Sequence, residues 1–384
     1  MVLAGFAAFL DLYSTQPLLP MLARTFRASA FDVSLTVTAP TIAVALMAPY
    51  VGRLADRVGL RTVIVGSALA LAAATLLAGT ASTLRQLIAW RFVQGAVTPG
   101  LFASTVAYIH EEWPVARAGR VTAAYVTGTV IGGVTGRLLG GVVANDVGWS
   151  WSFVVLGAIG CGVAGALWLW LPPEHRRGDA AHPTAGSWSH LFHRQLIATY
   201  AVGFCMLCTQ LAMFTYVPFL LAAPPFSLST KALGLLFLTY LMGALVTPFA
   251  GRGIDAYGHR AVLVAALGLC AGGAVMTLSP SLTVVSLGLS IFATGVFCAQ
   301  AASSSHVAHH AERDRALAIG LYVSCYYVGG TVGGSVPAGL WAAGGWRACV
   351  AFILGVEAAM LAIAWRYWQP TKRESADLRS QIAD

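Results

Sequence analysis

Apolar residues occupy this chain in long runs that short polar segments interrupt. Seven long runs contain no Asp, Glu, Lys or Arg: 33–52, 62–84, 92–110, 147–173, 195–230, 261–311 and 316–346. Each has about the ~20 residues that cross a bilayer as a helix, or about twice that number. Backbone groups in hydrocarbon must be paired internally, and these runs lack the alternation of barrel strands, so the pattern predicts transmembrane helices.

Division of the runs at charges and turn signals gives about twelve helices. Three divisions fall at Ser279-Pro280-Ser281, Ala223-Pro224-Pro225 and Gly344-Gly345, because Pro and Gly make continued helix unfavourable. The predicted helices span 2–23, 32–52, 62–81, 86–109, 120–144, 150–171, 195–221, 232–250, 261–279, 283–305, 316–343 and 347–368. The expected fold class is an all-α polytopic membrane protein.

Composition narrows the class of protein further. Of the 384 residues, 58% are hydrophobic and 10% are charged, whereas soluble proteins carry roughly 25% charged residues. A surface so poor in charge suits lipid and excludes a soluble globular fold. The formal net charge of +8 could indicate a nucleic-acid partner. However, Lys and Arg lie at the ends of the predicted helices, so we expect the lipid bilayer as partner and no nucleic acid.

The Lys and Arg residues between the helices fall into two unequal groups. The first group has sixteen members: Arg53, Arg57, Arg61, Arg117, Arg120, Arg176, Arg177, Arg194, Arg252, Arg260, Arg313, Arg315, Arg366, Lys372, Arg373 and Arg379. The second has five: Arg24, Arg27, Arg85, Lys231 and Arg347. Because positive residues are retained in the cytoplasm, the first group and both termini are predicted to be cytoplasmic. Two six-helix bundles, 1–171 and 195–368, are then joined by a cytoplasmic linker at 172–194 and followed by a cytoplasmic tail at 369–384.

The two predicted bundles share an internal repeat. One loop motif, formed by Gly52, Arg53, Asp56, Gly59 and Arg61, recurs 199 residues later as Gly251, Arg252, Asp255, Gly258 and Arg260. A second set, formed by Gly132, Gly133, Gly136 and Trp149, recurs 197 residues later as Gly329, Gly330, Gly333 and Trp346. Parallel repeats of six helices are typical of transporters that bind substrate between the halves near the bilayer midplane.

With these motifs the chain resembles the major facilitator superfamily over nearly its whole length. The loop 52–61 resembles the family's signature, Arg91-Phe92-Val93-Gln94-Gly95 resembles its fourth-helix motif, and the glycine-rich segment 128–141 resembles its antiporter motif. Segment 13–20 is most similar to the bacterial sugar and drug efflux branch. This resemblance implies a monomeric, proton-coupled exporter of a small organic molecule in the bacterial inner membrane, with the loop motif as a gate.

The chain departs from the family pattern at two places. Gly132-Gly133 stands where the antiporter motif usually has Gly-Pro, which weakens the case for antiport. Ala256 stands in the second loop copy where the first has Arg57, which predicts unequal gating by the two halves. An uncoupled facilitator or a proton symporter of the same fold therefore stays open, with a membrane-embedded enzyme as a remote alternative.

Three ionisable residues within predicted helices are candidates for proton coupling. Asp11 lies in the first helix, where an ionised carboxylate costs on the order of 3 kcal/mol. The resemblance places the first and fourth helices around the cavity, so Asp11 and Arg91 are expected to face the same space. The alternative is a fixed ion pair between them. Glu357 in the last helix is the rival acid, or a local hydrogen-bond partner.

Uncharged polar and aromatic residues supply candidates for the substrate cavity, although most such residues pack or lie at the membrane interface. The candidates are Tyr13, Gln16, Gln94, Gln210, Phe214, Tyr216, Gln300, Ser303 and Ser304. A separate set is predicted to pack helices closely: Gly128, Gly132, Gly133, Gly136, Gly140, Gly329 and Gly333. Arg137 is assigned to packing or gating, on a glycine face that we expect to meet the other half.

The sequence predicts neither a metal nor a cofactor. His306 and His310 have a spacing that could share a metal, but only Glu312 stands near as a third ligand. Cys205 and Cys208 have redox spacing inside an apolar helix, where thiols are usually inert packing. The chain has no GxxxxGK loop for ATP.

Overall fold

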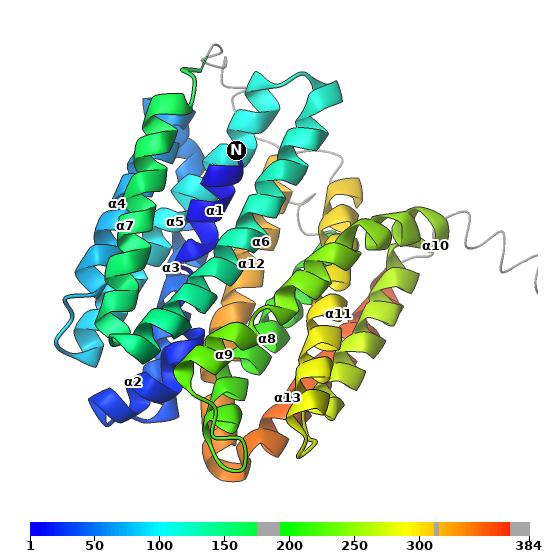
Figure 1. Ribbon diagram of the computed structural model, residues 1–384. Coiled ribbons are helices and arrows are strands. Elements are labelled where there is room, and N and C mark those ends of the chain that lie inside the picture. The colour runs from blue at the N-terminus through cyan, green and yellow to red at the C-terminus, as the bar shows by residue number, and fades with distance from the viewer. Residues whose placement is uncertain (175–192, 311–314, 369–384) are drawn as a thin grey trace, which may run out of the picture. The chain divides into compact units, whose positions relative to one another are not determined.

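The computed structural model describes residues 1–174, 193–310 and 315–368 (Figure 1), and regular structure in these ranges is entirely helical, which confirms the all-α prediction. The helices of the first half are α1 (Val2–Leu10), η1 (Gln16–Leu18), α2 (Leu19–Phe26), α3 (Ala30–Val58), α4 (Leu60–Ala78), α5 (Leu84–Glu112), α6 (Val115–Asp146) and α7 (Trp149–Trp170). Those of the second half are α8 (Arg194–Ala222), α9 (Thr230–Leu236), α10 (Thr239–Met276), α11 (Leu282–His310), α12 (Arg315–Ser335) and α13 (Pro337–Tyr367). Within the described ranges, nine helical segments are long and apolar enough to cross a membrane.

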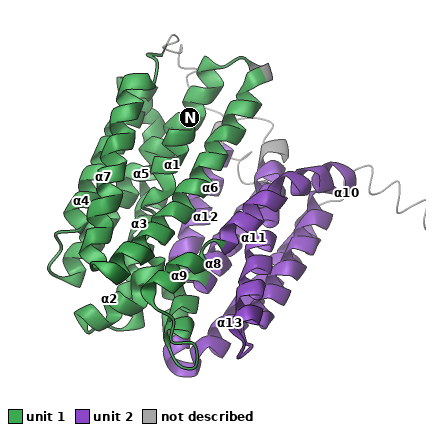
Figure 2. Ribbon diagram, in the orientation of Figure 1, with its two compact units in different colours: residues 1–184, 214–238, 334–339 green, residues 185–213, 239–333, 340–384 purple. Residues whose placement is uncertain are grey.

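The chain forms two compact units (Figure 2). Unit 1 comprises residues 1–184, 214–238 and 334–339, and unit 2 comprises residues 185–213, 239–333 and 340–384. In unit 1 an apolar core joins α1, α3, α4, α5 and α7. In unit 2 a second core joins α8, α10, α11 and α13.

The first predicted helix, 2–23, is wrong as one continuous element. α1 ends at Leu10, the next residues form turns, and a 3₁₀ segment and α2 follow. Pro17 and Pro20 lie in the first turns of η1 and α2, where a proline is tolerated because the missing N–H would have had no intrahelical partner. Asp11 therefore caps a helix end rather than lying inside a helix.

Glycines with positive φ repeat at matched places in the two halves. Gly59, between α3 and α4, has φ 91°, and its counterpart Gly258 has φ 83° inside α10. Gly148, before α7, has φ 113°, and its counterpart Gly345 has φ 61° inside α13. L side chains rarely adopt this conformation, so the sequence repeat is also a repeat of backbone bends.

A glycine ridge on α6 lies against α1. Cβ atoms added at Gly128, Gly132 and Gly136 would collide with the backbone carbonyls of Val2, Phe6 and Leu10, respectively. In unit 2, Gly329 and Gly333 of α12 face the carbonyls of Phe204 and Cys208 in the same way. Both ridges follow the four-residue spacing that lets two helix backbones approach closely.

The ridge thus packs within its own sequence half, and the expectation that it meets the other half is wrong. Past Gly136, α6 does approach a helix of the second half. A Cβ added at Gly234 of α9 would lie 3.1 Å from the Arg137 carbonyl, and Gly141 also faces this helix. The Cβ added at Gly141 would lie 2.8 Å from Gly234 Cα, inside unit 1.

Candidate functional site

Arg91 of α5 is fully buried beside the break that ends α1. Its Nη1 donates to the Asp11 carbonyl at 2.7 Å, and its Nη2 donates to the Leu12 carbonyl. Its Nε donates to the Thr36 carbonyl of α3 at 2.8 Å. The carbonyls at a helix end lack intrahelical partners, so the guanidinium satisfies them and fastens the break to α3 and α5.

The carboxylate of Asp11 is also buried, with 2% of the residue exposed. Arg91 bonds to the backbone of Asp11, and the side-chain Oδ1 finds no hydrogen-bond partner in the described part of the chain. A buried ionised carboxylate is unfavourable unless it is paired. The two residues that the resemblance placed together are thus neighbours, with the positive group held by carbonyl oxygens.

Gln94 lies one helical turn beyond Arg91, and both the oxygen and the nitrogen of its side-chain amide are hydrogen-bonded. Its Oε1 accepts from Arg91 Nη1 at 2.6 Å, and its Nε2 donates to Thr75 Oγ1 at 2.8 Å. Thr75 on α4 was not singled out from the sequence, because an isolated Thr in an apolar helix carries no distinctive pattern. In this structure Gln94 positions Arg91.

Arg137 of α6 forms a second buried cationic cluster in unit 1, with 3% of the residue exposed. Its Nε donates to Gln16 Oε1 at 2.7 Å, and its Nη1 donates to the Gly133 carbonyl at 2.7 Å. The guanidinium carbon lies 4.9 Å from the ring centre of Tyr13 and 5.1 Å from that of Phe237. Phe237 was missed, since one apolar residue in an apolar run gives no signal.

The break after α1 connects the two clusters. Asp11 and Leu12 accept from Arg91, whereas Tyr13 and Gln16 contact Arg137. A change in the conformation of this short segment would therefore alter the contacts of both guanidinium groups.

The candidates in the second half lie in both units. In unit 2, Gln210 donates to Tyr240 Oη at 3.3 Å and accepts from Tyr326 Oη at 3.4 Å. The sequence did not single out either tyrosine. Buried side-chain oxygens of Gln300 and Ser303 have no hydrogen-bond partner in the described ranges, and Ser304 is exposed and donates to the Gln300 carbonyl at 2.7 Å.

Phe214 and Tyr216 lie at the end of α8 that belongs to unit 1. The ring centres of Phe214 and Phe237 are 5.9 Å apart, so Phe214 lies beside the Arg137 cluster. Tyr216 donates to the Gly334 carbonyl at 2.7 Å and is fully buried, which is the arrangement of a packing residue.

Glu357 of α13 is buried in unit 2, with 4% of the residue exposed. Neither carboxylate oxygen has a hydrogen-bond partner within the described residues. Among the described residues, each unit thus buries one acid with an unpartnered oxygen, and of these two acids only Asp11 lies beside a buried arginine.

The first copy of the loop motif is fastened to the end of α7. Arg61 donates from Nε to the Leu171 carbonyl and from Nη2 to the Trp168 carbonyl, both at 2.8 Å. The carboxylate of Glu174 accepts from the backbone N–H of Leu60 at 2.8 Å, at the N-terminus of α4. A carboxylate is favourable there because of the helix dipole.

The second copy makes different contacts. Arg260 stacks on the Trp365 ring at 3.8 Å, and His259 Nε2 lies 3.0 Å from Ser305 Oγ. The remaining charged residues, Arg53, Asp56 and Arg57 in the first copy and Arg252 and Asp255 in the second, are exposed.

In the described ranges, neither the histidine pair nor the cysteine pair forms a metal site or a disulfide. His306 is buried, lies 2.9 Å from Thr199 Oγ1 through Nδ1, and stacks on Trp368 with ring centres 4.0 Å apart. The side chain of His310 and all of Glu312 lie outside what the structure describes. Within the described residues, no three His, Cys, Asp or Glu side chains gather to hold a metal, and Cys205 and Cys208 are buried free thiols.

Comparison of the sequence with known proteins identifies the family. The sequence profile of the Major Facilitator Superfamily matches residues 1–311 and again residues 203–383. The inner membrane transport protein YnfM of Escherichia coli (strain K12) is 31% identical over 368 residues, which cover 94% of this chain and 87% of YnfM. The uncharacterized MFS-type transporter YybF of Bacillus subtilis (strain 168) is 28% identical over 357 residues, which cover 91% of this chain and 88% of YybF.

Solved transporter structures share the fold. A bacterial homolog of the human lysosomal transporter Spinster, in an inward-facing and occupied conformation, superposes with a TM-score of 0.78 at 18% identity over 95% of both chains. The nucleoside transporter NupG superposes with a TM-score of 0.75 at 15% identity, over 96% of this chain and 98% of NupG. The sequence profile and the likeness to YnfM together establish that this multi-pass membrane protein belongs to the major facilitator superfamily of transporters.

Proposed function

We propose that the protein exports a small organic molecule across the bacterial inner membrane in exchange for protons, by alternating access. The inner-membrane location of YnfM supports the same location here. The observation that carries the proposal is the buried carboxylate of Asp11, which has an unpartnered oxygen next to a fully buried Arg91.

Protonation of Asp11 is coupled to the shape of the break after α1. Arg91 bonds to the carbonyls of Asp11 and Leu12, and we assign this arrangement to the neutral carboxyl group. Once the proton leaves, the negative carboxylate competes with those carbonyls for the guanidinium, because a charge-assisted hydrogen bond is roughly twice as strong as a neutral one. The break then rearranges and moves Tyr13 and Gln16, which contact Arg137.

This competition makes substrate binding and proton binding mutually opposed, as antiport requires. The ionised form of Asp11 favours the substrate-binding arrangement, and the neutral form permits the return step. Because coupling is reciprocal, substrate binding promotes release of the proton to the same extent that protonation weakens substrate binding.

Two other transport mechanisms that the same fold supports would give a different dependence of substrate binding on pH. A facilitator binds its substrate without regard to the proton on Asp11, and a symporter binds substrate more tightly when Asp11 is protonated. A membrane-embedded enzyme would turn over its substrate in detergent, where no compartments exist.

The first test is a thermal-shift screen of a metabolite and drug library with the purified protein, because a ligand of the folded state raises the melting temperature. The affinity of a ligand found in this way is then measured against pH. We expect affinity to rise with pH in the wild type and to be independent of pH in Asp11→Asn.

The matched control is Asp146→Asn, which removes an exposed acid at the end of α6 in the same half. It should keep the pH dependence of the wild type. Affinity that falls with rising pH would indicate symport, and equal profiles for the wild type and Asp11→Asn would remove Asp11 from the mechanism.

A further inference from the structure

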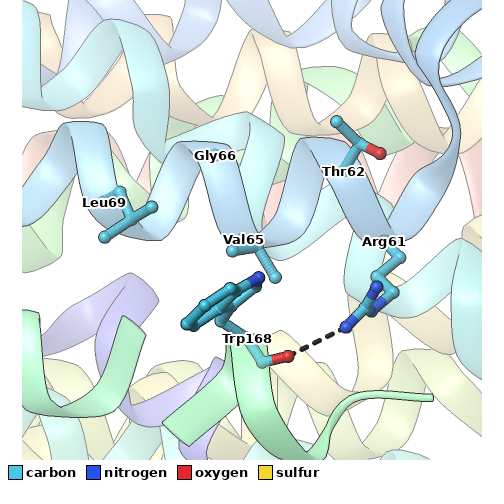
Figure 3. A pocket seen from close by; sticks show the side chains of 6 residues that line it. All are labelled: Arg61, Thr62, Val65, Gly66, Leu69 and Trp168. Carbon is cyan, nitrogen blue, oxygen red and sulfur yellow. Dashed lines mark hydrogen bonds between the residues drawn. The ribbon is translucent and has the colours of Figure 1, made fainter. Parts of the chain in front are cut away.

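An open groove of about 500 Å³ lies between α4 and α7 of unit 1 (Figure 3). It is lined by Arg61, Thr62, Val65, Gly66, Leu69 and Trp168. One of its ends is cationic, and the rest is apolar.

The cationic end is held rigidly. Arg61 is anchored by its bonds to the Trp168 and Leu171 carbonyls, one of which is drawn in Figure 3. Both acceptors are neutral oxygens, so these two bonds leave the guanidinium charged. The nearby carboxylate of Glu174 is held by the backbone N–H of Leu60 at 2.8 Å, at the N-terminus of α4. Thr62, the next residue along α4, also lines the groove and is exposed.

The depth of the groove in the membrane follows from its aromatic residues. Trp168 and Trp170, at the end of α7, are 62% and 74% exposed, and Leu169 between them is 71% exposed. Tryptophans that border apolar spans are enriched at headgroup level. From Arg61 to Leu69, α4 rises by about 12 Å, so the groove runs from that level into the hydrocarbon.

Gly66 keeps the floor of the groove open. A Cβ built on Gly66 meets no atom within 4 Å. The lack of a side chain leaves a channel along α4 between the Arg61 end and Leu69, with the Trp168 indole beside it (Figure 3).

We propose that this groove binds an anionic phospholipid, with the phosphate at Arg61 and Thr62 and one acyl chain along Gly66 and Leu69. An acyl chain gains little by leaving the bilayer for an apolar groove, since lipid tails are equally apolar. Selectivity must therefore come from the headgroup. One basic residue at the membrane surface corresponds to a preference of about fivefold for an anionic over a zwitterionic lipid.

The test is native mass spectrometry of the full-length protein in detergent, titrated with phosphatidylglycerol or phosphatidylethanolamine of the same acyl chains. We expect the wild type to bind phosphatidylglycerol about fivefold more tightly. Gly66→Phe should lose this bound lipid, because its ring enters the groove. The space around Gly66 lets the ring enter without displacing protein atoms, so the melting temperature of the lipid-free protein should be unchanged.

Gly268→Phe is the matched control, since Gly268 on α10 is also exposed and its added Cβ also meets no atom within 4 Å. It should bind phosphatidylglycerol as the wild type does. Arg61→Gln should retain lipid but lose the headgroup preference, and Arg61→Lys should keep it. Equal binding of the two lipids by the wild type, or unchanged phosphatidylglycerol binding by Gly66→Phe, would overturn the proposal.

Discussion

Replacing Gly136 by alanine is expected to destabilise unit 1, because α1 and α6 touch there through their backbones. The added Cβ would overlap the Leu10 carbonyl, which belongs to helix backbone and cannot rotate away as a flexible side chain does. Overpacking of this kind typically costs about 1–3 kcal/mol. Alanine also raises helix propensity by about 1 kcal/mol, which partly offsets the loss.

The comparison variant is Gly66→Ala, where the propensity gain is the same and the added Cβ meets no atom within 4 Å. Propensity cancels between the two variants, so Gly136→Ala should be less stable than Gly66→Ala by about 1–3 kcal/mol. For a unit of this size the difference corresponds to a melting temperature lower by roughly 2–12 °C. Thermal unfolding in detergent, followed by far-ultraviolet circular dichroism, measures it. A thiol-reactive dye is unsuitable, because the buried cysteines of the described chain all lie in unit 2.

The same substitution should impair transport, because Leu10 directly precedes Asp11. A displacement of the end of α1 moves the carbonyls that hold Arg91. Gly128→Ala meets Val2 at the other end of α1 and should leave transport less affected at a similar loss of stability. Equal melting temperatures for Gly136→Ala and Gly66→Ala, together with full transport by both, would refute the account of this interface.

Two further predictions concern the gate and the topology. Asp56→Asn should shift the protein toward opening at its cytoplasmic ends by about 0.3–1 kcal/mol, because Asp56 is exposed. Asp255→Asn should do less, because Ala256 removes the adjacent charge. Distances between spin labels at those ends measure this, and equal shifts would contradict the asymmetry. In a cysteine-free background, a cysteine at Ser82 should react with an impermeant thiol reagent in intact cells, whereas one at Asp179, which lies outside the described residues, should be protected. The reverse pattern would invert the topology.

Hydrophobic patterning predicted the helical class and most helix positions, because length and apolarity are properties of local sequence. It did not predict the break in the first helix. Pro17 and Pro20 permit a helix to start at either residue, so the sequence alone does not say that Asp11 ends one helix. At the break, the Asp11 carbonyl accepts from Ser14, three residues on, and from Arg91, which lies 80 residues away. The second of these donors cannot be inferred from the local sequence.

The glycine ridges illustrate a similar limit. The four-residue spacing of Gly128, Gly132 and Gly136 predicted close packing, and it carries no information on which helix approaches. The contact of Glu174 with the N-terminus of α4 was also missed, because Glu174 opens a polar linker and only the fold brings it to Leu60. Long-range partners such as these follow from topology, which single-residue patterns do not encode.

The most direct test of proton-coupled export is ligand accumulation in proteoliposomes under an imposed pH gradient, measured beside ligand exchange without a gradient. The wild type should do both. Asp11→Asn should lose accumulation and keep exchange, because it mimics the neutral acid, and Glu357→Gln should retain both. Full pH-driven accumulation by Asp11→Asn, with its loss in Glu357→Gln, would show that the coupling acid lies in the other half of the protein.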